Sequence, residues 1–323
     1  MKTFREDVWK AEEYHYEAAY GFIPNLMTYL HDDEETRPCM IVVPGGGYCM
    51  VVPPEGESVA KEFYNRGMNT FVFTYTTDIT MSVPLKTQPL MDISRAVRYV
   101  RKNAARFCID PEKIVICGFS AGAHVCATLG VHFDYAVDPD PEMKEISNRP
   151  DAMILSYPVI TAGEFTHEYS IQTLVGKDAP AVEKDFFSLE KHVSETTPPS
   201  FIWQTVEDNL VPVENSMLFA QQCRAQGVPY AYYAFPHGWH GLSVHTDSWR
   251  KGEFGEPYTM EQVMRAVEAV KAGNGVRVSE QRKAELIEQF SQEPSMPEGE
   301  APKFEDVAMW PDLASAWMKS LWK

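Results

Sequence analysis

The fold of this chain is decided by the stretch Ile114-Val115-Ile116-Cys117-Gly118-Phe119-Ser120-Ala121-Gly122-Ala123-His124. A short apolar run passes into small and apolar residues at helical spacing, which predicts a strand, a tight turn and a helix. Gly118 and Gly122 remove the side chains that would clash where a strand doubles back into a helix. Ser120 is therefore expected at the apex of a strained turn, above the carboxyl end of a sheet. The N–H group of Ala121, at the start of the helix, would point to the same place.

The pattern Gly-x-Ser-x-Gly is a weak signal by itself, because glycine and serine are common residues. Its setting is more specific, since an apolar strand precedes it and a helix follows. A serine in this position is a candidate nucleophile, and the rest of the chain should supply a base, an acid and a second donor for an oxyanion. His124, just past the serine on the same helix, is expected to be packed in the core instead.

A second glycine-rich turn, Pro44-Gly45-Gly46-Gly47-Tyr48, follows the apolar run at 39–43. Three successive glycines free backbone N–H groups to face a ligand. A plain flexible turn is the alternative. The functional interpretation places the N–H of Gly46 or Gly47 beside that of Ala121, as two halves of an oxyanion hole.

The composition is that of a soluble globular protein, with 323 residues, 44% of them hydrophobic and 23% charged. A net charge of −17 argues against nucleic acid or an anionic membrane surface as a partner. The N-terminal residues include no apolar signal-like run, and the six cysteines lie far apart, so we expect a reduced, cytoplasmic protein. Neither cysteines nor histidines have metal-ligand spacing, and we expect no metal and no cofactor.

Apolar strands alternate with amphipathic helices over some 200 residues of the chain. This pattern predicts an α/β fold with a mostly parallel, doubly wound sheet, in a single domain that covers residues 1–323. Residues 161–198 fit an excursion over the carboxyl edge of the sheet. The basic residues of the helix that begins near Ile93 are interpreted as solvated charge, and they are Arg95, Arg98, Arg101, Lys102 and Arg106.

Residues 245–303 predict a helical insert before the last helix of the chain. The insert contains two helical stretches, at 260–271 and 279–290, and a polar linker at 292–302. It could cap the active site, contact a second subunit in a homo-oligomer, or decorate the surface, and we favour one of the last two roles.

The acid and the base should follow the serine in the order Ser, Asp or Glu, His. The predicted strand at 201–206 leads into Glu207 and Asp208, and an acid just past a strand end can accept the Nδ1 proton of an imidazole. We choose Asp208, with Glu207 as the rival. The last predicted strand, at 230–235, leads into a glycine-flanked loop with His237 and His240, and spacing alone does not separate the two.

Four motifs together resemble the acetyl-esterase and acetylxylan-esterase-like branch of the α/β-hydrolases, near the hormone-sensitive-lipase-like esterases. The motifs are Pro-Gly-Gly-Gly-Tyr at 44–48, Gly-Phe-Ser-Ala-Gly-Ala-His at 118–124, Asp-Asn-Leu-Val-Pro-Val-Glu-Asn-Ser at 208–216 and His-Gly-Leu at 240–242. The resemblance spans about residues 20–243 and resumes in the final helix. It favours His240 over His237, because the family's catalytic histidine is followed by glycine and an apolar residue. The bulky loop around Trp239 and the insert depart from the family pattern.

The resemblance implies an α/β-hydrolase fold and a serine esterase with Ser120, His240 and Asp208 as its triad. The substrates expected on this basis are carbohydrates that carry short acyl groups, acetyl above all, such as acetylated xylo- or manno-oligosaccharides. Bulky side chains next to catalytic positions are expected to shape the substrate pocket, and they are Tyr48, Phe119 and Trp239.

Three other functions are compatible with the same motifs. A serine peptidase of the oligopeptidase type shares the fold and the triad order, although the chain shows no propeller-like region. A general short-chain carboxylesterase would use the same chemistry on other alcohols. A ligand-binding protein with an inactive triad is the alternative from outside the enzymes.

Overall fold

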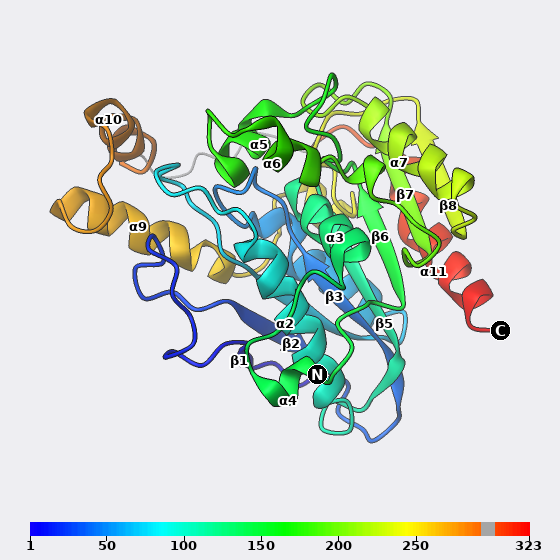
Figure 1. The fold of residues 1–323 in the computed structure, drawn as a ribbon. Coiled ribbons are helices and arrows are strands. Elements are labelled where there is room, and N and C mark those ends of the chain that lie inside the picture. The colour runs from blue at the N-terminus through cyan, green and yellow to red at the C-terminus, as the bar shows by residue number, and fades with distance from the viewer. Residues whose placement is uncertain (292–300) are drawn as a thin grey trace.

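A single sheet organises the computed structural model, which describes residues 1–291 and 301–323. Its eight strands lie in the order β1-β2-β4-β3-β5-β6-β7-β8 (Figure 1). β2 is antiparallel to its neighbours β1 and β4, and every pair from β4 to β8 is parallel. The mostly parallel sheet predicted from the sequence is confirmed. The strands are β1 (Arg5–Asp7), β2 (Asn25–Tyr29), β3 (Arg37–Val43), β4 (Asn69–Thr74), β5 (Ile109–Phe119), β6 (Ala152–Ser156), β7 (Ser200–Thr205) and β8 (Tyr230–Phe235).

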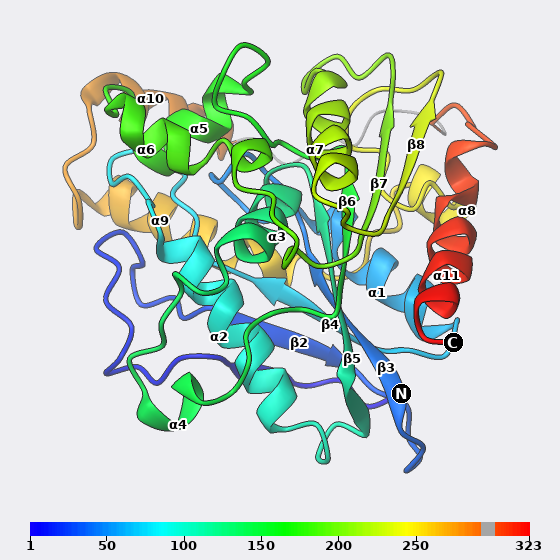
Figure 2. The same ribbon diagram turned by 45° about the vertical axis from the view of Figure 1, so that its right-hand side comes forward.

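Helices cover both faces of the sheet, as expected for a doubly wound fold (Figure 2). In β3, Ile41 and Val43 pack with the helices of one face, and Met40 and Val42 with those of the other. This alternation follows from the two-residue period of a strand, and it explains why the central strands read as continuous apolar runs. One face carries α2 (Gln88–Lys102), α3 (Ala121–His132) and α7 (Glu214–Ala225), and the other carries α1 (Glu57–Tyr64) and α11 (Trp310–Leu321).

The excursion between β6 and β7 contains two short helices, α5 (Glu168–Val175) and α6 (Ala181–Phe186). A shorter helix, α4 (Pro141–Lys144), lies between α3 and β6. Searching the described residues finds no helix with the length and apolar character that crossing a membrane requires.

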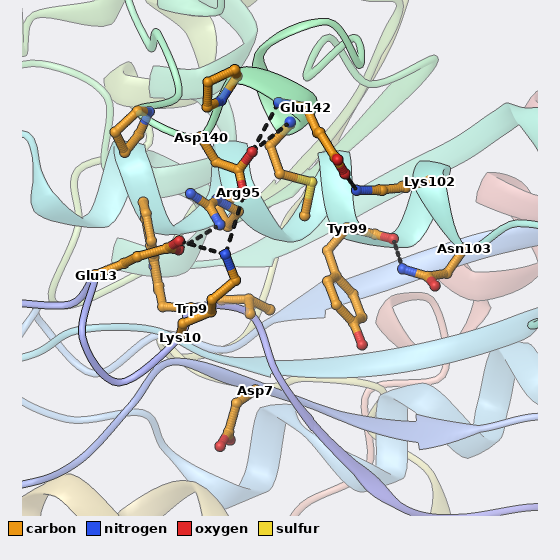
Figure 3. Close-up of a pocket in the computed structure, with 14 residues that line it drawn as sticks. Asp7, Trp9, Lys10, Glu13, Arg95, Tyr99, Lys102, Asn103, Asp140 and Glu142 are labelled. Atoms are coloured by element: carbon orange, nitrogen blue, oxygen red, sulfur yellow. Dashed lines mark hydrogen bonds and ion pairs between the residues drawn. The ribbon is translucent and has the colours of Figure 1, made fainter.

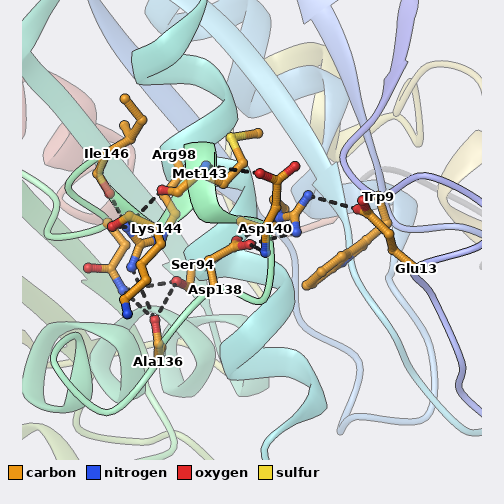
Figure 4. A network of polar contacts seen from close by, with 12 residues as sticks. Trp9, Glu13, Ser94, Arg98, Ala136, Asp138, Asp140, Met143, Lys144 and Ile146 are labelled. Atoms are coloured by element: carbon orange, nitrogen blue, oxygen red, sulfur yellow. Dashed lines mark hydrogen bonds and ion pairs between the residues drawn. The ribbon is translucent and has the colours of Figure 1, made fainter.

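Two arginines of α2 are buried, so the prediction of a solvated basic face was wrong for them. Arg95 is 2% exposed, and its Nε and Nη2 each donate a 2.6 Å hydrogen bond to the carboxylate of Asp138. Its guanidinium lies over the Trp9 ring, 4.1 Å from the centroid (Figure 3). Arg98 donates to backbone carbonyls that include those of Ala136 and Met143 (Figure 4). The apolar spacing of α2 could not reveal that residues 136–146 fold over this side of the helix.

The insert contributes α8 (Asp247–Arg250), α9 (Glu261–Ala272) and α10 (Glu280–Gln289), so both predicted helices are present. Both ribbon views place α9 and α10 on the opposite side of the molecule from α11 (Figures 1 and 2). α9 buries Val263 and Val267 against Ile79, and the Gln262 amide makes hydrogen bonds of 2.9 and 2.6 Å with the backbone of Thr77. Residues 292–300 of the predicted linker lie outside the described ranges, and the role of the insert stays a prediction.

Candidate active site

The turn between β5 and α3 holds Ser120 in a strained conformation, with φ 51° and ψ −119°. A Cβ atom on Gly122 would lie 2.1 Å from the carbonyl oxygen of Val43, and one on Gly118 would lie 2.5 Å from Cα of Ala123. Both positions therefore require glycine, because the atoms in the way belong to the backbone and cannot move aside. The strand, turn and helix predicted around Ser120 are all present.

Three side chains from separate loops meet above the carboxyl edge of the sheet. Ser120 follows β5, Asp208 follows β7, and His240 follows β8. The Nδ1 atom of His240 lies 2.8 Å from Oδ2 of Asp208, and its Nε2 atom lies 2.8 Å from Oγ of Ser120. Because an ionised carboxylate can only accept, Nδ1 carries the proton and Nε2 accepts from the serine hydroxyl. The imidazole is thus arranged to take the proton of the serine.

The Asp208 side chain is fully buried and held by several donors. Its Oδ1 atom accepts 2.9 Å hydrogen bonds from the N–H groups of Leu210 and Val211. Burial by itself raises the pKa of this carboxyl, but the hydrogen bond from His240 and the two N–H donors outweigh burial and leave the pKa below its usual value. The acid is therefore ionised where it faces the imidazole.

Glu207 and His237, the rival acid and base, pair with each other instead. Oε1 of Glu207 lies 3.0 Å from Nδ1 of His237, with the two side chains 59% and 67% exposed. Neither residue contacts Ser120, which lies beneath His240. The structure thus brings together the acid and the base that were preferred from the sequence, and keeps their neighbours in solvent.

Backbone N–H groups suited to an oxyanion border the serine. Gly46 and Gly47 line the same pocket as Ser120 and have positive φ angles of 127° and 63°. Within residues 1–291 and 301–323, no protein acceptor takes the N–H of either glycine. Ala121 is the first residue of α3, where an N–H has no acceptor inside its own helix. The N–H groups of Gly46, Gly47 and Ala121 are therefore candidate oxyanion donors, and their role in catalysis is a proposal.

The pocket above Ser120 and His240 has a volume of about 600 Å³. Beyond Ser120, His240 and the glycines, its wall is largely apolar and is formed by Met50, Val52, Pro54, Tyr169 and Leu210. Two further polar side chains face this space, and they are Glu55 and His167.

Tyr48 and Phe119 were wrong as substrate-binding residues, because both are buried away from the pocket. Tyr48 is 1% exposed and donates a 2.7 Å hydrogen bond to Nδ1 of His124. Phe119 is fully buried and packs against Trp310. Trp239 lies at the surface against Phe304 and is not part of the pocket wall. The prediction relied on adjacency in sequence to the proposed catalytic positions. Side chains of neighbouring residues in a turn or strand point in different directions, so adjacency did not place them in the pocket.

The same contacts confirm that His124 is packed in the core. Its Nε2 donates to the carbonyl of Phe187 at 3.0 Å, which leaves Nδ1 to accept from Tyr48. Burial lowers the pKa of His124 to about 4. A neutral ring with both nitrogens bonded is a structural histidine.

Glu55, His167 and Tyr169 were not found from the sequence. His167 and Tyr169 lie in the 161–198 excursion, which was expected over this edge of the sheet, although no motif singled them out. Nδ1 of His167 lies 2.8 Å from Oγ of Ser170, and burial lowers the pKa of the ring. Glu55 follows the glycine loop by eight residues, a spacing that carries no signal of its own.

A larger pocket of about 890 Å³ lies on the α2 side of the molecule, away from Ser120 (Figure 3). Its charged groups largely neutralise each other, with Lys10 on Glu13 at 2.8 Å and Lys102 on Glu142 at 2.8 Å. The described residues contain no cluster of three or more His, Cys, Asp or Glu that could hold a metal. We therefore place the candidate active site in the smaller pocket, where a nucleophile, a base and an acid converge.

Comparison with known proteins gives the same family by sequence and by structure. The BD-FAE family model matches residues 27–223. Over 270 residues the chain is 60% identical to endo-1,4-beta-xylanase B of Butyrivibrio fibrisolvens, a match that covers 84% of this chain and 42% of that protein. An acetylxylan esterase of Xylanibacter ruminicola is 30% identical over 227 residues, with 68% of this chain and 44% of that protein covered. The chain thus spans less than half the length of these relatives.

Among solved structures, the acetyl ester-xyloside bifunctional hydrolase of Caldicellulosiruptor lactoaceticus superposes with a TM-score of 0.71 at 35% identity. The match covers 84% of this chain and 96% of that one. These findings confirm the resemblance to α/β-hydrolase esterases that the four sequence motifs indicated. The chain belongs to the BD-FAE family and has the α/β-hydrolase fold.

Proposed function

We propose that this chain is a serine esterase that removes acetyl groups from carbohydrates, with acetylated xylo- or manno-oligosaccharides as substrates. The observation that carries the proposal is the hydrogen-bonded series Ser120–His240–Asp208, with both links at 2.8 Å. The relatives named acetylxylan esterase and acetyl ester-xyloside hydrolase support the choice of acyl group and sugar.

The reaction is a two-step acyl transfer. Nε2 of His240 takes the Ser120 proton as Oγ attacks the ester carbonyl, and Asp208 stabilises the imidazolium that forms. The imidazolium then gives its proton to the ester oxygen of the sugar as its bond to the acyl carbon breaks, so the sugar leaves with a free hydroxyl and the acyl group remains on Oγ. Water, deprotonated by the same imidazole, attacks this ester and releases acetate, and the proton returns to Ser120.

Backbone N–H groups stabilise the negative oxygen of each tetrahedral intermediate. Ala121 supplies one donor and Gly46 or Gly47 supplies the other. A donor of this kind contributes roughly 3 kcal/mol in the transition state. Because these donors belong to the backbone of the turn and of the neighbouring glycine loop, little reorganisation is needed when charge develops.

The pocket has more room than an acetyl group needs. Its volume of about 600 Å³ accommodates the alcohol part of the ester as well. Tyr169 and Leu210 offer apolar surface to a sugar ring, and His167 offers a polar ring nitrogen. A general short-chain carboxylesterase remains the second candidate, since this wall is not narrow enough to dictate one alcohol.

Cytoplasmic location and a homo-oligomeric state remain predictions.

The test measures loss of acetyl groups from acetylated xylo- and manno-oligosaccharides by mass spectrometry. The wild type should remove them, and Ser120→Ala should retain less than about one part in a thousand of the activity. Ser320→Ala, at the far end of α11, serves as the control and should match the wild type. An aryl acetate compared with an aminoacyl anilide separates esterase from peptidase. Efficient cleavage of the anilide alone would refute the proposal.

A further inference from the structure

Glu55 places a buried carboxylate in the wall of the catalytic pocket, outside the triad. It ends the short 3-10 helix Pro53–Glu55 and is 4% exposed. Within the described ranges, no lysine or arginine pairs with it. Its two oxygens are bound separately, Oε2 by the N–H of Gly45 at 2.7 Å and Oε1 by the hydroxyl of Tyr157 at 2.8 Å. A buried carboxylate without a cationic partner is costly, which points to a function for it.

The Oε2 atom of Glu55 anchors the glycine loop, which comprises residues 44–48. A Cβ atom on Gly45 would lie 2.6 Å from the carbonyl oxygen of Phe119 and 2.8 Å from Cβ of Ser120, so the loop runs directly against the nucleophile. Gly46 and Gly47, which supply the proposed oxyanion donors, follow immediately. A glycine backbone has more conformational freedom than that of other residues. The hydrogen bond from Gly45 to Glu55 fixes the point at which this segment begins.

The Oε1 atom of Glu55 is connected through Tyr157 to the histidine loop, which is the loop that follows β8 and contains His240. The Tyr157 hydroxyl donates to Glu55 and accepts a 3.1 Å hydrogen bond from the N–H of Ser243, three residues past His240. The Tyr157 ring also meets the imidazole of His240 edge to face, with centroids 4.9 Å apart and planes at 69°. One carboxylate is therefore connected to both loops that must meet at Ser120.

We infer that Glu55 is a positioning residue, which holds the glycine loop and the histidine loop in their positions beside Ser120. It also supplies a second negative charge near the imidazolium of His240. The inference rests on the proposed esterase function and adds to it. Asp208 bonds the imidazole directly, whereas Glu55 acts through Tyr157 and through the field of its charge. In the low-dielectric pocket that field is only weakly screened.

The charge on Glu55 depends on pH. Burial raises the pKa of this carboxyl, and the hydrogen bonds from Gly45 and Tyr157 together with the His240 charge offset burial only in part. The other titratable groups that its charge influences are Tyr75 and Cys117, both neutral in the working range because burial raises their pKa values. As pH falls, Glu55 is protonated at a higher pH than an exposed glutamate, and its contribution to the rate disappears.

The experiment compares Glu55→Gln and Tyr157→Phe with the wild type on an aryl acetate. Glu57→Gln is the matched control, a carboxylate two residues away that pairs with Lys61 on α1. Glu55→Gln should lower kcat at least tenfold with KM within twofold, and Tyr157→Phe should lower kcat less, because Gly45 remains anchored. The acid side of the kcat/KM profile should also become less steep in Glu55→Gln, since one ionisation has been removed. Glu57→Gln should leave all three measurements unchanged.

The possible outcomes separate this inference from the proposed function. An active wild type whose kcat and pH profile survive both substitutions would overturn the inference alone. A rise of KM with unchanged kcat would also overturn it and would make Glu55 a substrate contact. A wild type that hydrolyses no ester would overturn both. If Glu55→Gln fails to fold, the kinetics of Tyr157→Phe decide the question, because that variant keeps the carboxylate and breaks its connection to the histidine loop. A lower kcat with unchanged KM would support the inference, and a wild-type kcat would overturn it.

Discussion

Asp208 and Glu207 are adjacent in the chain, but each lies within hydrogen-bond distance of a different imidazole. Asp208 pairs with His240, and Glu207 pairs with His237. We expect Asp208→Asn to lower kcat by about 10⁴-fold, because an amide cannot hold His240 in the tautomer that accepts the serine proton. Glu207→Gln should stay within about twofold of the wild type, since its exposed pair with His237 contributes little. Steady-state kinetics on an aryl acetate checks both variants. The opposite ranking would make Glu207 the acid.

We expect His124 to make the stability of the fold depend on pH. Burial lowers its pKa to about 4 in the folded protein, against about 6.5 in an unfolded chain. Between these values the unfolded chain binds a proton that the folded protein does not, so stability is complete above pH 6.5 and falls as pH drops toward 4. The loss amounts to about 3 kcal/mol.

Urea unfolding at pH 7 and pH 5 tests this expectation. The variant His124→Gln keeps an amide donor for the Phe187 carbonyl but does not titrate, so it should be less stable at pH 7 and should show less decline toward pH 5. His237→Gln, on the exposed ring, should follow the wild type. A decline that is the same in all three proteins would assign the pH dependence to other groups.

At the scale of elements, α3 approaches the end of β3 so closely that Gly122 cannot bear a side chain. Gly122→Ala would place Cβ 2.1 Å from the Val43 carbonyl, and we expect a loss of at least about 3 kcal/mol of unfolding free energy together with the esterase activity. Gly130→Ala on the same helix is the control. Its Cβ meets the flexible Met153 side chain, and the helical preference of alanine, about 1 kcal/mol, offsets much of the contact. Chemical denaturation measures the unfolding free energy of both variants. Equal losses in Gly122→Ala and Gly130→Ala would contradict this explanation.

The elements that the sequence predicted best are those with a strong apolar period. The parallel strands and α9 appeared close to their expected positions, because burial on one or both faces leaves a clear pattern. The apolar run that begins at Ala152 continues to Ile160, but β6 ends at Ser156, and the next residue, Tyr157, takes a positive φ of 38°. The apolar run continues past that point because the loop is also buried, and hydrophobicity alone does not reveal a change of backbone direction.

The candidate site was predictable in so far as its residues sit at strand ends. The parallel topology brings the carboxyl ends of strands to one edge, and it pointed to Ser120, to Glu207 or Asp208, and to His237 or His240. The family resemblance then favoured His240. Glu55 and His167 could not be found in this way. They reach the pocket through loops whose path depends on tertiary packing, and no local spacing records that path.

At the scale of the whole molecule, the buried pair of Arg95 and Asp138 connects α2 to the segment that follows α3, and Trp9 joins the N-terminal region to it. Asp138→Asn should cost about 3 kcal/mol of unfolding free energy, because it leaves the guanidinium buried without its bidentate partner. Glu142→Gln breaks the exposed pair with Lys102 and should cost less than about 0.5 kcal/mol. Chemical denaturation at neutral pH measures both, and equal costs would show that burial of the pair contributes nothing.

The positive φ angle of Ser120 has a consequence for how this enzyme could evolve or be engineered. Glycine adopts such a backbone without the steric cost that a side chain incurs, which is about 1–2 kcal/mol. Ser120→Gly and Ser120→Ala remove the same hydroxyl, so the difference between their unfolding free energies measures the cost of the turn itself. We expect the glycine variant to be the more stable of the two by about 1 kcal/mol, after allowance for the greater freedom of glycine in the unfolded chain. If Ser120 is the nucleophile, as proposed, selection for stability alone would favour glycine at this position and would remove the activity.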